Sequence, residues 1–116
     1  MNFDGVEIKA DLKIVAPSVG NMPATIDEEA MRLCECVGET GSLNKAAKKM
    51  GMSYSRAWRI LNRIENAFGI RILDTDGARG SVPTDEAEKL IGAFYSAQEA
   101  AEKVARETIC SAHAQR

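Results

Sequence analysis

Residues Ser42 to Phe68, SLNKAAKKMGMSYSRAWRILNRIENAF, are the stretch around which the chain is organised. Two runs with apolar residues at helical spacing lie on either side of Gly51, and a serine precedes each run. Serine caps helix N-termini, and glycine adopts the left-handed conformation that ends many helices. The stretch therefore predicts a helix over Leu43 to Met50 and a second over Tyr54 to Phe68. Because only three residues separate them, the pair is expected to cross tightly as a helix-turn-helix.

The second of these helices has two unlike faces. At about 100° per residue, one arc is apolar and is expected to face the core; it comprises Tyr54, Ala57, Ile60, Leu61, Ile64 and Phe68. The opposite arc carries side chains that can bond base edges or hold phosphates; it comprises Ser55, Arg56, Arg59, Asn62, Arg63 and Asn66. Trp58 lies at the border, where we expect it to pack beside Tyr54, with contact to a ligand or phosphate as the alternative.

Charge is unevenly distributed. Residues 42–84 carry eight basic and three acidic side chains, which gives 8 − 3 = +5, whereas the whole chain has a net charge of −2. Six Lys or Arg and no Asp or Glu occur between Ser42 and Arg63. Binding follows the local field rather than the sum, so the middle third is the candidate contact surface for a polyanion.

Two elements are expected before this stretch. Apolar and polar residues alternate from Val6 to Ile14, which predicts a strand with one face on a core. A loop with two prolines and a glycine follows. Thr25 and Glu28 have the spacing of a capping box, so we predict a first helix over Ile26 to Glu39, capped by Thr25.

A hairpin and a long helix are expected after it. Residues 70–73 predict a short strand, residues 76–80 a turn with Arg79 near its tip, and residues 81–82 a return strand ended by Pro83. A hairpin directly after a helix-turn-helix is the sequence pattern of a winged helix, and Arg79 could enter a minor groove or touch phosphate. Thr84 is expected to cap a last helix that runs to about Ala112.

This last helix is too long to be covered by so small a domain. Apolar and small residues repeat every three or four positions along it, as in a helix that pairs with another helix; the seam includes Leu90, Phe94, Ala97, Ala101 and Val104. We predict a mainly α fold with a small β component: a winged helix-turn-helix domain over residues 1–84, comprising a helix-turn-helix (42–68) and a wing (70–83). Residues 85–116 form a dimerisation helix.

Composition argues against several other classes. Aromatic residues are 5% of 116, the three cysteines form no zinc-site spacing, and the single histidine, His113, is near the end. No nucleophile and base recur together and no glycine-rich phosphate loop follows a strand, so we expect no enzyme, cofactor or metal site. Buried or half-buried thiols are expected for the cysteines. Without an apolar run of about 18 residues or a signal peptide, we expect a cytoplasmic protein.

Particular residues give a family resemblance over residues 6–95. Gly41-Ser42-Leu43, Ala46-Ala47, Gly51-Met52-Ser53-Tyr54 and Ala57-Trp58 resemble the N-terminal winged-helix domain of LysR-type regulators, and more closely that of the molybdate-responsive ModE family. The resemblance implies a homodimer that binds double-stranded DNA with the helix over residues 54–68 in the major groove. We expect no molybdate-binding domain in this chain and no membrane partner.

The sequence thus favours a DNA-binding transcriptional regulator, and a winged-helix protein-interaction module without specific DNA binding is the alternative. We expect Lys45, Lys48, Lys49 and Arg63 mainly at phosphates. Base edges are expected to be contacted by Ser55, Arg56, Arg59 and Asn62. The full set of expected DNA contacts is Ser42, Lys45, Lys48, Lys49, Ser53, Ser55, Arg56, Arg59, Asn62, Arg63 and Arg79.

Overall fold

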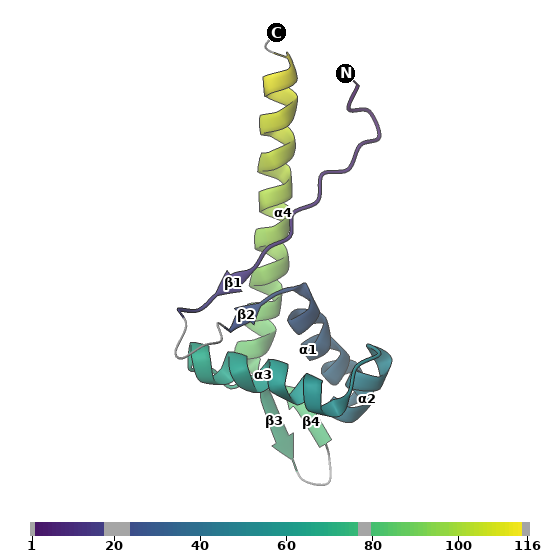
Figure 1. Ribbon diagram of the computed structural model, residues 1–116, viewed down its shortest axis with the longest axis vertical. Coiled ribbons are helices and arrows are strands. Elements are labelled where there is room, and N and C mark those ends of the chain that lie inside the picture. Colours follow the sequence, from purple (N-terminus) through teal and green to yellow (C-terminus); the bar gives the residue numbers. More distant parts are fainter. Residues whose placement is uncertain (1, 18–23, 77–79, 115–116) are drawn as a thin grey trace.

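The computed structural model describes residues 2–17, 24–76 and 80–114. Its elements, in chain order, are β1 (Ile14–Val15), β2 (Thr25–Ile26), α1 (Glu28–Thr40), α2 (Leu43–Lys49), α3 (Tyr54–Phe68), β3 (Leu73–Asp76), β4 (Gly80–Pro83) and α4 (Asp85–Ala114). Helices α1 to α3 gather at one end of the molecule with the β3–β4 hairpin beneath them, and α4 rises away from them (Figure 1). This arrangement confirms the predicted winged helix-turn-helix fold with a long last helix.

Local capping positions the helix-turn-helix as the sequence predicts. The Ser42 Oγ accepts a hydrogen bond from the Lys45 N–H, and the Ser53 Oγ accepts one from the Arg56 N–H. Gly51, between the helices, has a φ of +70°, which favours glycine because a Cβ is strained there. The bounds of α3 agree with the prediction, and α2 ends at Lys49, one residue early.

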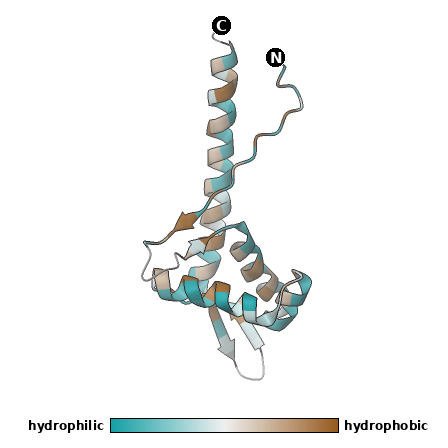
Figure 2. Cartoon of the chain, in the orientation of Figure 1, coloured by the Kyte–Doolittle hydropathy of each residue, from teal (hydrophilic) through white to brown (hydrophobic). Residues whose placement is uncertain are grey.

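The core lies where α1 meets α2, α3 and the start of α4. Small residues at α2 and α3 let these helices approach α1 closely, because an alanine side chain adds little to the interaxial distance. In Figure 2, α3 carries both strongly polar and strongly apolar residues, as expected for a helix with one face in the core. The buried core cluster comprises Ile26, Ala30, Met31, Leu33, Cys34, Val37, Leu43, Ala46, Ala47, Ala57, Leu61, Ile64, Ile72, Ala87 and Phe94.

The predicted N-terminal strand from Val6 to Ile14 is wrong for most of its length. Only Ile14 and Val15 form a strand, paired antiparallel with Ile26 and Thr25. The preceding segment runs beside α4 (Figure 1), held by side chains of that helix. Alternation indicates an extended backbone with two faces, but a strand also needs a partner, and here the partner is a helix.

Helix α1 begins later than predicted. Its cap is Asp27, whose carboxylate accepts the Ala30 N–H at 2.9 Å, and not Thr25. Thr25 and Ile26 belong instead to β2, because pairing with β1 holds their backbone extended. The capping-box pattern was misleading because a second capping residue follows Thr25 by two positions.

The hairpin also begins later than predicted. Leu73 opens β3 opposite Pro83, which lies within β4 rather than after it. Ile72 is fully buried in the core, and its N–H donates to the Glu65 carboxylate at 2.8 Å. The residues between α3 and β3 therefore tie the wing to α3 before the two-stranded ladder starts.

The first part of helix α4 packs on the domain core, and the rest projects away from it. The Thr84 Oγ1 accepts the Ala87 N–H, as predicted for its cap, and α4 continues to Ala114, two residues further than expected. Thirty residues span about 45 Å, so most of the helix extends beyond the domain. The radius of gyration is 17.5 Å, against about 13 Å for a compact chain of this length. No helix among the described residues is long and apolar enough to cross a membrane.

Candidate nucleic-acid interface

The outer face of α3 forms a polar and basic surface beside the wing. Ala57, Leu61 and Ile64 are buried on the inner side, whereas Ser55, Arg59 and other side chains of the opposite arc are exposed. Both α3 and the wing lie at the end of the molecule away from the C-terminal end of α4 (Figure 1). The fold therefore presents the predicted face to solvent, with the body of the domain behind it.

A groove separates α3 from the wing. Its volume is about 190 Å³, and its walls come from α3 on one side and from both wing strands on the other. The groove is lined by Leu43, Tyr54, Trp58, Leu61, Asn62, Glu65, Leu73, Thr75 and Ser81. The wing is thus placed to extend the surface of α3.

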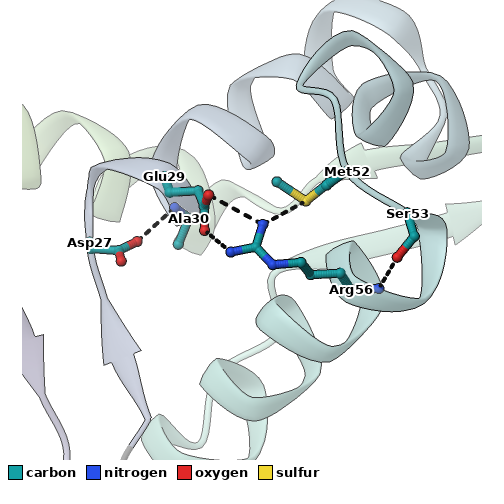
Figure 3. Close-up of polar contacts among 6 residues, drawn as sticks. All are labelled: Asp27, Glu29, Ala30, Met52, Ser53 and Arg56. Carbon is teal, nitrogen blue, oxygen red and sulfur yellow. Dashed lines mark hydrogen bonds and ion pairs between the residues drawn. The ribbon is translucent and has the colours of Figure 1, made fainter.

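Arg56 lies at the opposite side of this face, where it is paired with α1. Its guanidinium donates to both oxygens of Glu29, at 2.9 and 3.3 Å, and one nitrogen also lies 3.8 Å from the Met52 sulfur (Figure 3). The two side chains of the ion pair are 48% and 43% exposed. Arg56 is therefore oriented at the surface, and any anionic ligand would have to compete with Glu29 for it.

Within the described part of the chain, the lysines of α2 also divide into one that forms an ion pair and two that do not. Lys49 donates to the Glu39 carboxylate at 2.6 Å, and this hydrogen bond raises the pKa of Lys49. Lys45 and Lys48 are exposed and form no ion pair with any residue that the structure describes. Arg59 and Arg63 of α3 are likewise exposed and without an ion pair among the described residues. These four side chains would not have to break an ion pair of the described structure in order to bind a phosphate.

Ser42 and Ser53 have a structural role that the sequence also predicts. Each hydroxyl oxygen accepts a backbone N–H at the start of its helix. The hydroxyl hydrogen stays available to donate, so both serines keep the capacity to bond a phosphate oxygen. Asn62 is half-buried at the groove, and Arg79 lies outside the described residues.

Two aromatic residues on the face are more exposed than the sequence predicts. Tyr54 was expected in the core and Trp58 in packing contacts, yet they are 52% and 50% exposed. They lie in the first two turns of α3 and line the groove that faces the wing, so about half of each residue stays open to solvent. A shallow depression is lined by these two aromatics together with Ser55 and Arg59. The border position of Trp58 on the helical wheel was the signal in the sequence that could have indicated this.

The predicted dimerisation residues do not form one free surface. Phe94 is buried at 2% exposure and Leu90 is half-buried, so both belong to the domain itself. Ala97, Ala101 and Val104 are exposed on the projecting part of α4. Of the five predicted dimerisation residues, these three are therefore the ones open to solvent.

The cysteines lie away from the α3 face. Cys34 is buried in α1, and burial raises the pKa of its thiol to about 12. Cys36 and Cys110 are partly buried, so the predicted burial of the thiols is confirmed. Among residues 2–17, 24–76 and 80–114, no three His, Cys, Asp or Glu side chains come together as metal ligands.

Helix-turn-helix, wing and basic outer face together define a winged helix-turn-helix regulatory domain. The chain belongs to the lysR family of bacterial regulatory helix-turn-helix proteins, whose family model matches residues 29–88. The match begins within α1 and ends within the first turn of α4. It therefore covers the whole helix-turn-helix and the wing.

One relative is similar in sequence, and two solved structures are similar in fold. The molybdenum-pterin-binding protein MopB of Rhodobacter capsulatus is 31% identical over 75 aligned residues, and the match covers 61% of this chain and 28% of that protein. The chain thus spans about a quarter of the length of this relative. Solved structures of a CbnR_DBD–DNA complex and of a BenM_DBD complex with catB site 1 DNA resemble the fold. The CbnR_DBD structure has a TM-score of 0.55 and 20% sequence identity, and the match covers 72% of this chain and 95% of that one. For the BenM_DBD structure the TM-score is 0.53 and the identity 23%, and the match covers 73% of this chain and 92% of that one.

Proposed function

We propose that this regulator binds duplex DNA with α3 in the major groove and the wing alongside. The observation that carries the proposal is the exposed outer face of α3, which has three arginines and no acidic side chain from Tyr54 to Ile64. An α-helix with its side chains is about 10–12 Å across, and the major groove is about 12 Å wide. Membership of the family supports a regulatory rather than an enzymatic role, and we propose that it acts in the cytoplasm.

The side chains divide into two groups by position. Lys45, Lys48 and Arg63 lie at the margins and would neutralise phosphates. Ser55 and Arg59 project from the first turns of α3, where base edges would be within reach. Arg56 would join them after exchanging Glu29 for a base or phosphate. Lys49, Ser42, Ser53, Asn62 and Arg79 complete the proposed set.

We further propose that the chain binds as a homodimer through the projecting part of α4, with residues 1–84 as the DNA-binding unit. Two-fold symmetry would place two α3 helices in successive major grooves, about 34 Å apart or a multiple of that distance. The expected site is therefore an inverted repeat. No observation favours the alternative of a protein-interaction module without DNA binding.

Selection of bound sites from random duplex DNA, followed by fluorescence anisotropy on the selected site, tests the proposal. We expect Arg59→Ala to relax the preference for that site over scrambled DNA, because a base contact is lost. Lys48→Ala should weaken selected and scrambled DNA alike and lower the salt slope by about one. Lys103→Ala, on the far part of α4, is the charge-matched control and should change neither.

Two results would count against DNA binding by α3. One is the absence of any binding at about 50 mM salt, where phosphate contacts are strongest. The other is an Arg59→Ala variant that keeps the full sequence preference of the wild type.

A further inference from the structure

Tyr54 and Trp58 form an exposed aromatic patch within the basic face of α3. Half of each side chain is accessible to solvent, although both rings are large and apolar. Both are one turn apart on the same helix, so their rings lie on one side of it. Contiguous exposed apolar surface rimmed by polar residues is a mark of contact surfaces. The DNA contacts proposed above assign no role to either ring.

The surroundings of the patch indicate what it contacts. Ser55 and Arg59 line the same shallow depression as the two rings. At about 100° per residue, the outer face of α3 runs from Tyr54 and Trp58 on the wing side, through Ser55, to Arg59. No acidic side chain precedes Glu65 on this helix. A polyanion that meets Arg59 would therefore bring its own atoms against both rings.

An apolar ring in a major groove has one matching group on the DNA. Base pairs in a duplex are stacked, so their faces are unavailable, and their edges offer polar atoms except for the thymine C5-methyl group. Guanine offers only acceptors there, which suit Arg59, whereas the methyl group suits an indole or phenol ring. The patch and the arginine thus favour different bases at neighbouring positions.

We propose that Tyr54 and Trp58 determine specificity by contacting thymine methyl groups in the major groove. This inference rests on the proposed binding of DNA by α3 and adds the base class that the aromatic side of the helix selects. Burying one methyl group against the rings is expected to strengthen binding about three- to fivefold. One or two such positions per half-site would follow from the size of the patch.

Replacement of thymine by deoxyuridine tests this directly, because it removes the methyl group and keeps the base pairing. Each thymine of the selected site is replaced in turn, and wild-type affinity is measured by anisotropy. We expect about three- to fivefold weaker binding at one or two positions in each half-site, and no change elsewhere. Trp58→Ala should abolish the thymine preference at its position, and Tyr54→Ala at the neighbouring one.

Matched variants separate this contact from a general loss of affinity. Lys48→Ala should weaken binding while the ratio between thymine and uridine sites stays at its wild-type value. Trp58→Phe should keep part of the ratio, because an apolar ring remains. Far-ultraviolet circular dichroism should show unchanged helix content for every variant, since both aromatic side chains lie at the surface.

Intrinsic fluorescence supplies a second measurement, because Trp58 is the only tryptophan of the chain. A thymine site should shift its emission to the blue as solvent leaves the indole, and the corresponding uridine site should do so less. Equal affinity for thymine and uridine at every position would overturn the inference while leaving DNA binding intact. A uridine penalty that survives in both Trp58→Ala and Tyr54→Ala would also overturn it. A chain that selects no DNA at all would overturn both proposals.

Discussion

Arg56 and Glu29 connect α3 to α1, and the charge of Glu29 has two opposing consequences. The carboxylate holds the guanidinium in one orientation by two hydrogen bonds. It also places a negative charge beside a surface that would approach phosphates. Because both side chains are about half exposed, the pair is expected to contribute no more than about 1 kcal/mol to stability. Its larger effect should be on binding.

Glu29→Gln is therefore expected to strengthen DNA binding several-fold at about 50 mM salt, for selected and scrambled sequences alike. The change removes a repulsive charge and frees Arg56 for phosphate, and the gain should shrink at about 200 mM salt as screening increases. Anisotropy titrations at the two salt concentrations measure it.

Glu28→Gln is the matched control for this change. Glu28 carries the same charge on the same helix but pairs with Arg32 of α1, at 3.0 Å, rather than with α3. A much smaller effect is expected. An equal gain for the two variants would mean that overall charge matters and that the Arg56 pair does not.

Cys34 should be unreactive in the folded protein. Burial is the main cause that raises the pKa of its thiol from 9.0 to about 12, so at pH 9 only about one molecule in a thousand carries the thiolate. Iodoacetamide labelling followed by mass spectrometry should modify Cys34 slowly at pH 9 in buffer and rapidly in urea. The stability that comes from keeping this thiol neutral is fully present below pH 9 and is lost as the pH rises towards 12.

Cys36 and Cys110, which are partly buried, provide internal controls in the same experiment. They are expected to label faster than Cys34 in buffer and at a similar rate in urea. Labelling of Cys34 at the same rate as the other two cysteines in buffer would show that α1 opens readily.

The sequence predicts the polar part of the α3 face well but not the aromatic part. Ser53 and Gly51 fix where α3 starts, and periodicity then determines which side chains oppose the core, because both are local properties. Whether Trp58 is covered depends on which distant elements reach the first turns of α3, and periodicity carries no information about that. The pairing of Arg56 with Glu29 is similarly long-range, since 27 residues separate them.

At the scale of elements, a close backbone approach fastens the wing to the turn between α1 and α2. The Ser81 N–H donates to the Gly41 carbonyl at 2.9 Å. Gly80, beside it, has a φ of +85°, and a Cβ there would lie 2.2 Å from the same carbonyl oxygen. Neither the backbone conformation nor the space accommodates a side chain. Local sequence patterns gave no indication of this hydrogen bond, which joins residues 40 positions apart.

Gly80→Ala should consequently lower the free energy of unfolding by about 1–3 kcal/mol and displace the wing. Urea unfolding followed by circular dichroism measures the stability. Weaker DNA binding by the folded variant is expected in anisotropy, because the wing would no longer sit beside α3.

Gly92→Ala is the control, since Gly92 lies within α4 and a Cβ there would meet nothing within 4 Å. Alanine has the higher helix propensity, so this variant should be more stable by about 0.5–1 kcal/mol. Two glycine-to-alanine changes of opposite sign would separate the steric effect from the general effect of the substitution. An unchanged stability in Gly80→Ala would contradict the close approach.

The segment from Val6 to Lys13 shows most clearly what an alternating pattern leaves open. Side chains of α4 hold its backbone: the Ala10 N–H donates to Glu102 at 2.9 Å, and the Gln98 side chain donates to the Ala10 carbonyl at 3.0 Å. Arg106 donates to the Val6 carbonyl at 2.8 Å. Polar side chains of α4 thus form the backbone hydrogen bonds that a neighbouring strand would form in a sheet. Nothing in the spacing of Val6 to Ile14 distinguishes these two outcomes.

At the scale of the whole molecule, the projecting part of α4 has two differently occupied faces. Gln98, Glu102 and Arg106 succeed one another at intervals of four residues and hold the N-terminal segment. At about 100° per residue, Ala97 and Ala101 lie about a third of a turn away from them, and Val104 lies on the same side at 60% exposure. The N-terminal segment therefore leaves the outer part of the predicted seam open, which comprises Ala97, Ala101 and Val104.

Homodimerisation through this seam is the prediction that decides how the molecule would read an inverted repeat. Wild-type protein should sediment as a dimer at micromolar concentration, and Ala101→Glu should make it monomeric, because a charge would be buried between two helices. The affinity for an inverted repeat should then fall about 100-fold or more, since two linked half-site contacts become one. Ser96→Glu places the same charge on an exposed face of α4 well away from the seam and should leave both mass and affinity unchanged. A wild-type protein that sediments as a monomer at these concentrations would rule out the seam, and an Ala101→Glu variant that stays dimeric would move the interface elsewhere.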